Sequence, residues 1–143
     1  MTKEIIIRRF SGIILISLFL VLLPGTAGAQ NWKLDTTVEN VECYHAIIQC
    51  NGAPAVILRF VNKNDQEVNI NWEESFSTQQ VAGMQAGSRT GTQMKISKGE
   101  TKASDCNEAT HKNLVVLPGE AIPSYAATIQ SFQFKNVSVI RAK

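Results

Sequence analysis

The segment Ala55–Phe76, AVILRFVNKNDQEVNINWEESF, limits the fold more than any other part of the chain. Its first half is almost wholly apolar, and its second half alternates apolar with polar residues; both are rich in β-branched and aromatic side chains, as strands are. The turn-forming run Asn62–Asp65 separates the two halves. We therefore predict two strands joined as a hairpin, the first covered on both faces and the second with one face in water.

Shorter apolar or alternating runs, also typical of strands, occur elsewhere in the chain. No window has the periodicity of an amphipathic helix. A change of parity at Asn40 and another at Asn136 each suggest a bend or a β-bulge. Further strands are predicted at Lys33–Tyr44, Thr92–Ser97, Asn113–Pro118 and Phe132–Ala142. Strands separated by turn signals predict an all-β fold, an antiparallel β-sandwich of about seven to nine strands. Its predicted core comprises Val56, Leu58, Phe60, Ile70, Trp72, Ile96, Val115, Leu117, Phe134, Val137 and Val139.

Residues 1–29 have the features of a secretory signal peptide. Basic residues near the start precede the apolar run Ile13–Leu23, and the small residues Ala27–Ala29 complete a cleavage site before Gln30. The apolar run is too short to cross about 30 Å of hydrocarbon, which needs about 20 residues. We therefore expect a secreted or periplasmic protein in which residues 30–143 form a single domain without a membrane span.

The charge of the chain gives no sign of a nucleic-acid partner. The full sequence has 14 basic and 12 acidic residues, and the part that follows residue 29 has equal numbers of each, with the signs interspersed. Binding to nucleic acid or to an anionic membrane usually requires a basic patch. We expect instead a partner that is another envelope or extracellular protein, or a glycan.

The three cysteines are Cys43, Cys50 and Cys106. In an exported protein a disulfide is expected. The residues between Cys43 and Cys50 could fold back as a hairpin and bring the two α-carbons within the roughly 4.4–6.8 Å that a disulfide needs. We predict a Cys43–Cys50 disulfide. A bridge from Cys106 to either of the other two, and three free thiols, are the open alternatives.

The sequence offers no metal, cofactor or catalytic site. Cys43, His45 and Cys50 lack both a fourth ligand and the close cysteine pair of structural zinc sites, so His45 is expected to be a solvent-facing or hydrogen-bonded loop residue. A thiol enzyme built on Cys106 and His111 is a remaining alternative, because a nucleophilic cysteine needs a histidine within reach. Glycine-rich phosphate loops and hydrolase motifs are absent from the sequence. We expect a protein that is not an enzyme and that binds no cofactor.

The segment Ser77–Gln93 consists mainly of small and polar residues and contains three glycines. Loops of this length without secondary structure are uncommon in compact domains and often carry function. We therefore regard it as the first place to look for binding contacts. The alternatives are a mobile connection or an irregular edge strand through Gln79–Gln85.

Several of these features together resemble small exported immunoglobulin-like proteins of bacteria, many of which have no assigned activity. They are the A-x-A signal, the segment Val56–Trp72, a Gly-Glu turn ahead of Cys106, and the terminal run Ser131–Val139. The resemblance implies an immunoglobulin-like β-sandwich outside the cytoplasm and assigns no catalytic residue. The leading hypothesis is therefore an exported, non-catalytic binding or structural module. A small secreted inhibitor that presents a stapled Cys43–Cys50 loop is the alternative.

Overall fold

The computed structural model describes residues 30–141, so the predicted signal peptide lies outside the described part of the chain. Within that part the regular secondary structure is almost all β-strand, with one short helical turn. The elements are β1 (Lys33–Val38), β2 (Val41–Cys50), β3 (Ala53–Asn62), β4 (Val68–Thr78), β5 (Met84–Ala86), β6 (Thr92–Ile96), β7 (Gly99–Lys102), β8 (Val115–Val116), α1 (Pro118–Ala121) and β9 (Ile129–Arg141). The prediction of an all-β fold is confirmed.

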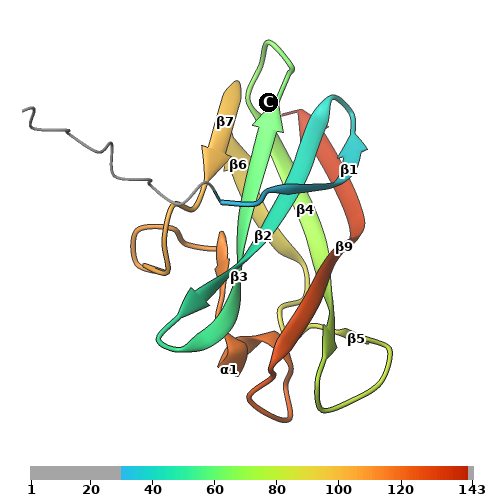
Figure 1. Cartoon of the computed structure of the whole chain (residues 1–143). Coiled ribbons are helices and arrows are strands. Elements are labelled where there is room, and N and C mark those ends of the chain that lie inside the picture. The colour runs from blue at the N-terminus through green and yellow to red at the C-terminus, as the bar shows by residue number, and fades with distance from the viewer. Residues whose placement is uncertain (1–29, 142–143) are drawn as a thin grey trace, which may run out of the picture.

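The strands form two antiparallel sheets (Figure 1). The first has the order β1-β2-β3, and β7 and β8 pair with the two ends of β3 on its far side. In the second, β4 is central, with β9 along one side and β5 and β6 along the other. No helix within residues 30–141 is long and apolar enough to cross a membrane.

The predicted hairpin between β3 and β4 is wrong. Both strands exist, but β3 belongs to the first sheet and β4 to the second, so the intervening turn crosses between the sheets. The buried Asn62 side chain holds this crossing: its Nδ2 donates to the carbonyl oxygen of Gln66 at 2.9 Å, and its Oδ1 accepts the backbone N–H of Asn64 at 3.0 Å. Alternation along the chain predicts strands but does not say which strands pair.

The hairpins in the structure join β1 to β2 and β2 to β3. Asn51 and Gly52 join β2 to β3 with φ values of 52° and 81°, and Glu39 and Asn40 join β1 to β2 with φ values of 46° and 61°. Both turns are left-handed at their two central positions, as type I′ hairpin turns require. The parity change predicted at Asn40 is therefore a tight turn between two strands.

The predicted Cys43–Cys50 disulfide is wrong. Both residues lie in the single strand β2, and seven steps of about 3.3 Å separate their α-carbons by roughly 23 Å. The structure instead pairs Cys50 with Cys106, with 5.8 Å between the α-carbons, and leaves Cys43 free and buried. The sequence separation of this bridge is 56 residues, for which the chain-entropy treatment gives a stabilisation of about 4 kcal/mol.

The two sheets face each other across one hydrophobic core. Phe60 of β3 packs against Trp72 of β4 and Phe134 of β9, with ring centroids 5.0 and 5.6 Å apart. Burying such a ring contributes about 1.5–3 kcal/mol. The predicted core residues are buried, except that Leu117, Val137 and Val139 are half-buried and pack against the core. The bend predicted at Asn136 is confirmed: φ is 48°, and the β4–β9 register shifts at this point.

Candidate functional site

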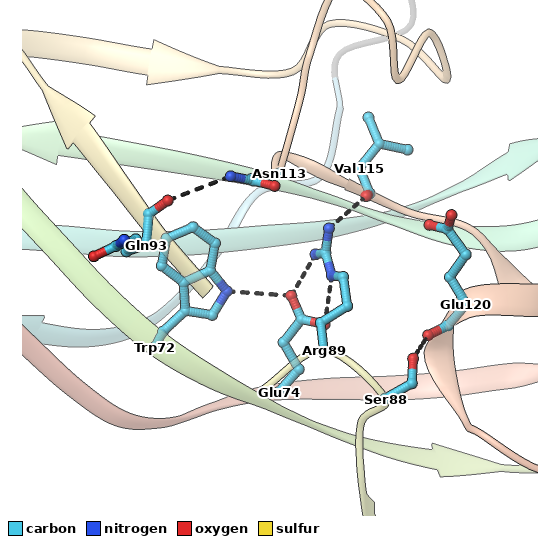
Figure 2. Close-up of polar contacts among 8 residues, drawn as sticks. All are labelled: Trp72, Glu74, Ser88, Arg89, Gln93, Asn113, Val115 and Glu120. Atoms are coloured by element: carbon cyan, nitrogen blue, oxygen red, sulfur yellow. Dashed lines mark hydrogen bonds and ion pairs between the residues drawn. The ribbon is translucent and has the colours of Figure 1, made fainter. Parts of the chain in front are cut away.

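The candidate site lies at the edge of the structure where β8 of the first sheet approaches β4 of the second (Figure 2). The chain between β5 and β6 passes over this edge. The backbone N–H of Gly87 donates to the carbonyl oxygen of Glu74 at 2.7 Å, and that of Ser88 donates to the carbonyl oxygen of Ala121 at 2.9 Å. A Cβ atom at Gly87 would lie 2.8 Å from the ring of Phe76, so only glycine allows so close an approach.

A buried ion pair between Glu74 and Arg89 lies here, and a further hydrogen bond of Arg89 links it to the first sheet. The Arg89 Nε–H donates to Glu74 Oε2 at 3.0 Å, and Nη2 of the same guanidinium binds Oε1. A third N–H group donates to the carbonyl oxygen of Val115 at 3.1 Å, and the Trp72 indole N–H donates to Glu74 Oε1 at 3.2 Å. The Glu74 side chain is fully buried and that of Arg89 is 20% exposed. This bidentate geometry, with two N–H groups on the two carboxylate oxygens, is the strong form of an arginine–carboxylate pair.

A pocket of about 400 Å³ opens beside this ion pair. Three separate parts of the chain form it: the β5–β6 segment, the connection between β7 and β8, and β8 together with α1. Its lining residues are Ser88, Arg89, Glu108, Asn113, Val115 and Glu120. The fold therefore brings together polar side chains that are far apart in the sequence.

Most of the hydrogen-bond donors around the pocket are already engaged. The Ser88 hydroxyl donates to the carbonyl oxygen of Glu120, Asn113 Nδ2 donates to the carbonyl oxygen of Gln93 at 3.3 Å, and Arg89 uses three of its N–H groups as described above. In contrast, Glu108 Oε1 is closed off from solvent and accepts no hydrogen bond from any residue of the 30–141 range. The residues that line the pocket thus include one carboxylate oxygen without a hydrogen-bond partner in the described part of the chain.

The pocket also carries an excess of negative charge. Glu74 balances the charge of Arg89, whereas neither Glu108 nor Glu120 takes part in a salt bridge among residues 30–141. Burial raises the pKa of Glu108 most; a side-chain hydrogen bond with Glu120 and then the charge of that carboxylate raise it further, while the Arg89 charge opposes the shift. A positive group placed between the two carboxylates would relieve their mutual repulsion.

The Ser77–Gln93 segment is only partly the open loop that the sequence suggests. Strand β4 continues to Thr78, and β5 adds a short edge strand at Met84–Ala86, which matches the edge-strand alternative in part. Gln80 binds Thr128 through both its amide nitrogen and its amide oxygen, at 2.9 and 3.1 Å. At the tip, Val81 is 44% exposed and Met84 45% exposed. The second half of the segment supplies Ser88 and Arg89 to the pocket.

The thiol-enzyme alternative is wrong, because Cys106 forms a disulfide and has no thiolate to offer. His111 Nε2 lies 3.1 Å from Ser104 Oγ and 3.4 Å from Asp105 Oδ1. Both partners approach the same ring nitrogen, whereas a catalytic triad uses one nitrogen for the nucleophile and the other for the carboxylate. The group does not have the geometry of a hydrolase.

The residues around Cys43 also differ from the expected loop. His45 is a strand residue, 5% exposed, and its ring packs against Phe132 at a centroid distance of 5.1 Å. Burial lowers the pKa of His45 and raises the pKa of Cys43 to about 12, with Asp35 adding to the latter shift. The thiol is therefore protonated and unreactive at neutral pH. The described residues contain no group of three or more His, Cys, Asp or Glu side chains that could hold a metal ion.

Glu74, Arg89 and Glu120 were not predicted as site residues from the sequence. One signal was present: Arg89 is the only charged residue in Ser77–Gln93, and a lone arginine in a small-residue loop suggests a buried or functional partner. The two carboxylates of the pocket, in contrast, are brought together only by the fold.

No family model, curated protein or solved structure matches the chain. The function therefore has to be argued from the geometry of the pocket.

Proposed function

We propose that this protein is an exported, non-catalytic binding module whose pocket recognises an organic cation, a primary ammonium or a guanidinium group. The observation that carries the proposal is the pair of pocket carboxylates, Glu108 and Glu120, which no salt bridge among residues 30–141 compensates. Glu108 Oε1 has no partner within the described range, while the donors of Ser88 and Asn113 are engaged. Ammonium and guanidinium groups donate hydrogen bonds and accept none.

The electrostatics support the same ligand class. The uncompensated Glu108 and Glu120 carboxylates would form charge-assisted hydrogen bonds with a bound cation. The volume of about 400 Å³ lies within the usual range for small-ligand sites. The ligand is either a free small amine or a lysine or arginine side chain of an extracellular protein. Both sources present the same cationic group.

Two further observations bear on the export of the protein and on its fold class. A disulfide between Cys50 and Cys106 is compatible with an oxidising, extracytoplasmic location. Two facing antiparallel sheets support an immunoglobulin-like sandwich, although the continuous β1-β2-β3 meander differs from the immunoglobulin order, in which the second strand pairs with the first and the fifth. The alternative of a small inhibitor required a loop closed by a Cys43–Cys50 disulfide, and Cys50 is bonded to Cys106 instead.

Calorimetric titration of the oxidised protein tests the proposal. We expect n-butylammonium to bind with a Kd of about 1 mM, a reasonable value for so small a ligand, and n-butanol, its neutral analogue, not to bind. A peptide containing one lysine, compared with the same peptide containing norleucine, distinguishes a protein ligand from a free amine.

Matched variants locate the binding. Glu108→Gln and Glu120→Gln should each weaken n-butylammonium binding about tenfold or more, because each removes a charged acceptor. Glu39→Gln serves as the control, since it removes an exposed carboxylate in the β1–β2 turn, away from the pocket. Equal binding of butanol and butylammonium, or an equal loss in all three variants, would contradict the proposal.

A further inference from the structure

The Cys50–Cys106 disulfide supports one wall of the pocket. The connection between β7 and β8, residues 103–114, carries Glu108 and Asn113, two of the lining residues. Hydrogen bonds to β3 fix its two ends: the N–H of Ala103 donates to the carbonyl oxygen of Leu58 at 3.1 Å, and the N–H of Leu58 donates to the carbonyl oxygen of Leu114 at 2.8 Å.

Between those ends, residues 104–113 have few other attachments. The N–H of Leu114 donates to the carbonyl oxygen of His111, and the other hydrogen bonds of Asn107 and His111 stay within the segment. Two hydrogen bonds reach other described parts of the chain, from Gln30 Nε2 to the carbonyl oxygen of Ser104 and from Asn113 Nδ2 to the carbonyl oxygen of Gln93. Cys106 Sγ also lies 3.7 Å from the carbonyl oxygen of Gln49, but in the disulfide it has no hydrogen to donate. The disulfide at Cys106 is therefore the principal tie that holds Glu108 beside Arg89.

The rest of the fold has its own contacts, which do not run through this disulfide. Cys50 is the last residue of β2, and it is paired with Ala53 in the β2–β3 ladder whether or not it is oxidised. The core is formed by both sheets and by the aromatic cluster of Phe60, Trp72 and Phe134. Cys50 is 3% exposed, whereas Cys106 is partly exposed and open to attack.

We infer that this disulfide is a redox control of the pocket: its reduction releases residues 104–113 and weakens cation binding while the two sheets stay folded. The inference rests on the proposed function for its binding readout. A dithiol reductant supplies the electrons. One of its thiolates attacks Cys106 Sγ and displaces Cys50 as a thiolate, which takes up a proton. The second reductant thiolate then displaces Cys106, giving two protein thiols and one oxidised, cyclic reductant.

Two measurements on the same samples test this inference. The oxidised protein, the dithiothreitol-reduced protein and the Cys50→Ser/Cys106→Ser variant are titrated with n-butylammonium and followed by hydrogen exchange. We expect binding at least tenfold weaker without the disulfide. Amide exchange should be at least tenfold faster in residues 104–113, with protection retained in β3 and β4. Cys43→Ala, which keeps the disulfide, should behave as the oxidised wild type does.

Other results would overturn the inference. Unchanged affinity and exchange after reduction would show that the segment needs no disulfide. Loss of protection throughout β3 and β4 would show a staple of the whole fold instead of a control of the pocket. If the oxidised protein does not bind n-butylammonium, the proposed function fails. The exchange data then decide the structural inference alone: faster exchange confined to residues 104–113 supports it, and any other pattern overturns it.

Discussion

At the scale of single residues, the contact between Glu74 and Arg89 should contribute strongly to stability. The Glu74 carboxylate is fully buried and accepts bonds from both Arg89 and Trp72. Glu74→Gln leaves the largely buried guanidinium without its counter-charge, which typically costs 3–5 kcal/mol. We expect the free energy of unfolding, measured by urea titration, to fall by about 3 kcal/mol.

A surface pair provides the matched control. Glu100 forms a 2.7 Å ion pair with Arg59 on partly exposed side chains, and such pairs contribute about 0–1 kcal/mol. Glu100→Gln should therefore lower the free energy of unfolding by less than 1 kcal/mol. Similar losses in Glu74→Gln and Glu100→Gln would mean that burial adds nothing to the first pair.

At the scale of elements, the β2–β3 hairpin depends on the backbone of one glycine. Gly52 has a φ of 81°, and no heavy atom lies within 4 Å of the position where its Cβ would be. Gly52→Ala therefore introduces no clash, and its effect comes from forcing an L-residue into the left-handed region, about 1–2 kcal/mol. We expect a lower melting temperature with an unchanged circular dichroism spectrum.

Gly119 in α1 is the comparison for this substitution. A Cβ there also meets nothing within 4 Å, and its φ is not in the left-handed region. Because alanine is favoured over glycine in a helix, Gly119→Ala should leave the melting temperature unchanged or raise it slightly. Equal destabilisation by both substitutions would contradict the role given to the Gly52 backbone.

The same hairpin shows how far the sequence predicts the elements. The strands around Phe60 and Trp72 were predicted because alternation and β-branched composition are local properties. Which strands pair with each other was not predicted correctly, because pairing depends on the sheet that each strand joins. Asn51–Gly52 is the strongest hairpin signal in the chain. Recognising it would have placed Cys50 at the end of a strand and excluded a bridge back to Cys43.

At the scale of the whole molecule, most of the candidate site was beyond prediction from the sequence. Glu108 and Glu120 meet because the connection after β7 and the turn α1 both return to the edge of the first sheet. No periodic pattern in the sequence predicts that these two parts of the chain come back to the same sheet edge. The core was predictable because burial follows from local hydrophobicity, whereas a pocket between connections follows from the arrangement of the complete fold.

The whole molecule should also lose stability in mild acid because of His45. Burial lowers the pKa of His45 in the folded protein, and Lys33 acts in the same direction, while Asp35 opposes the shift. The unfolded chain, in which a histidine has a pKa near 6.5, therefore binds more protons than the folded one. Stability is fully present above that value and falls as the pH is lowered from about 6.5 towards the folded pKa.

Urea titrations between pH 7.5 and 5.0 measure this effect, in the wild type and in His45→Gln. The wild type should lose stability across this range, and the variant should lose less, whatever its absolute stability. The quantity to compare is the slope of the free energy of unfolding against pH, because replacing a buried ring that packs on Phe132 changes the core as well as the charge.

The carboxylates whose pKa is lowered by ion pairs, such as Glu67 and Asp65, do not contribute to this slope. They lose their stabilising charge only at more acidic pH, since their folded pKa lies below the ordinary value of about 4. Identical slopes in the two proteins would show that the His45 imidazole does not couple protonation to folding.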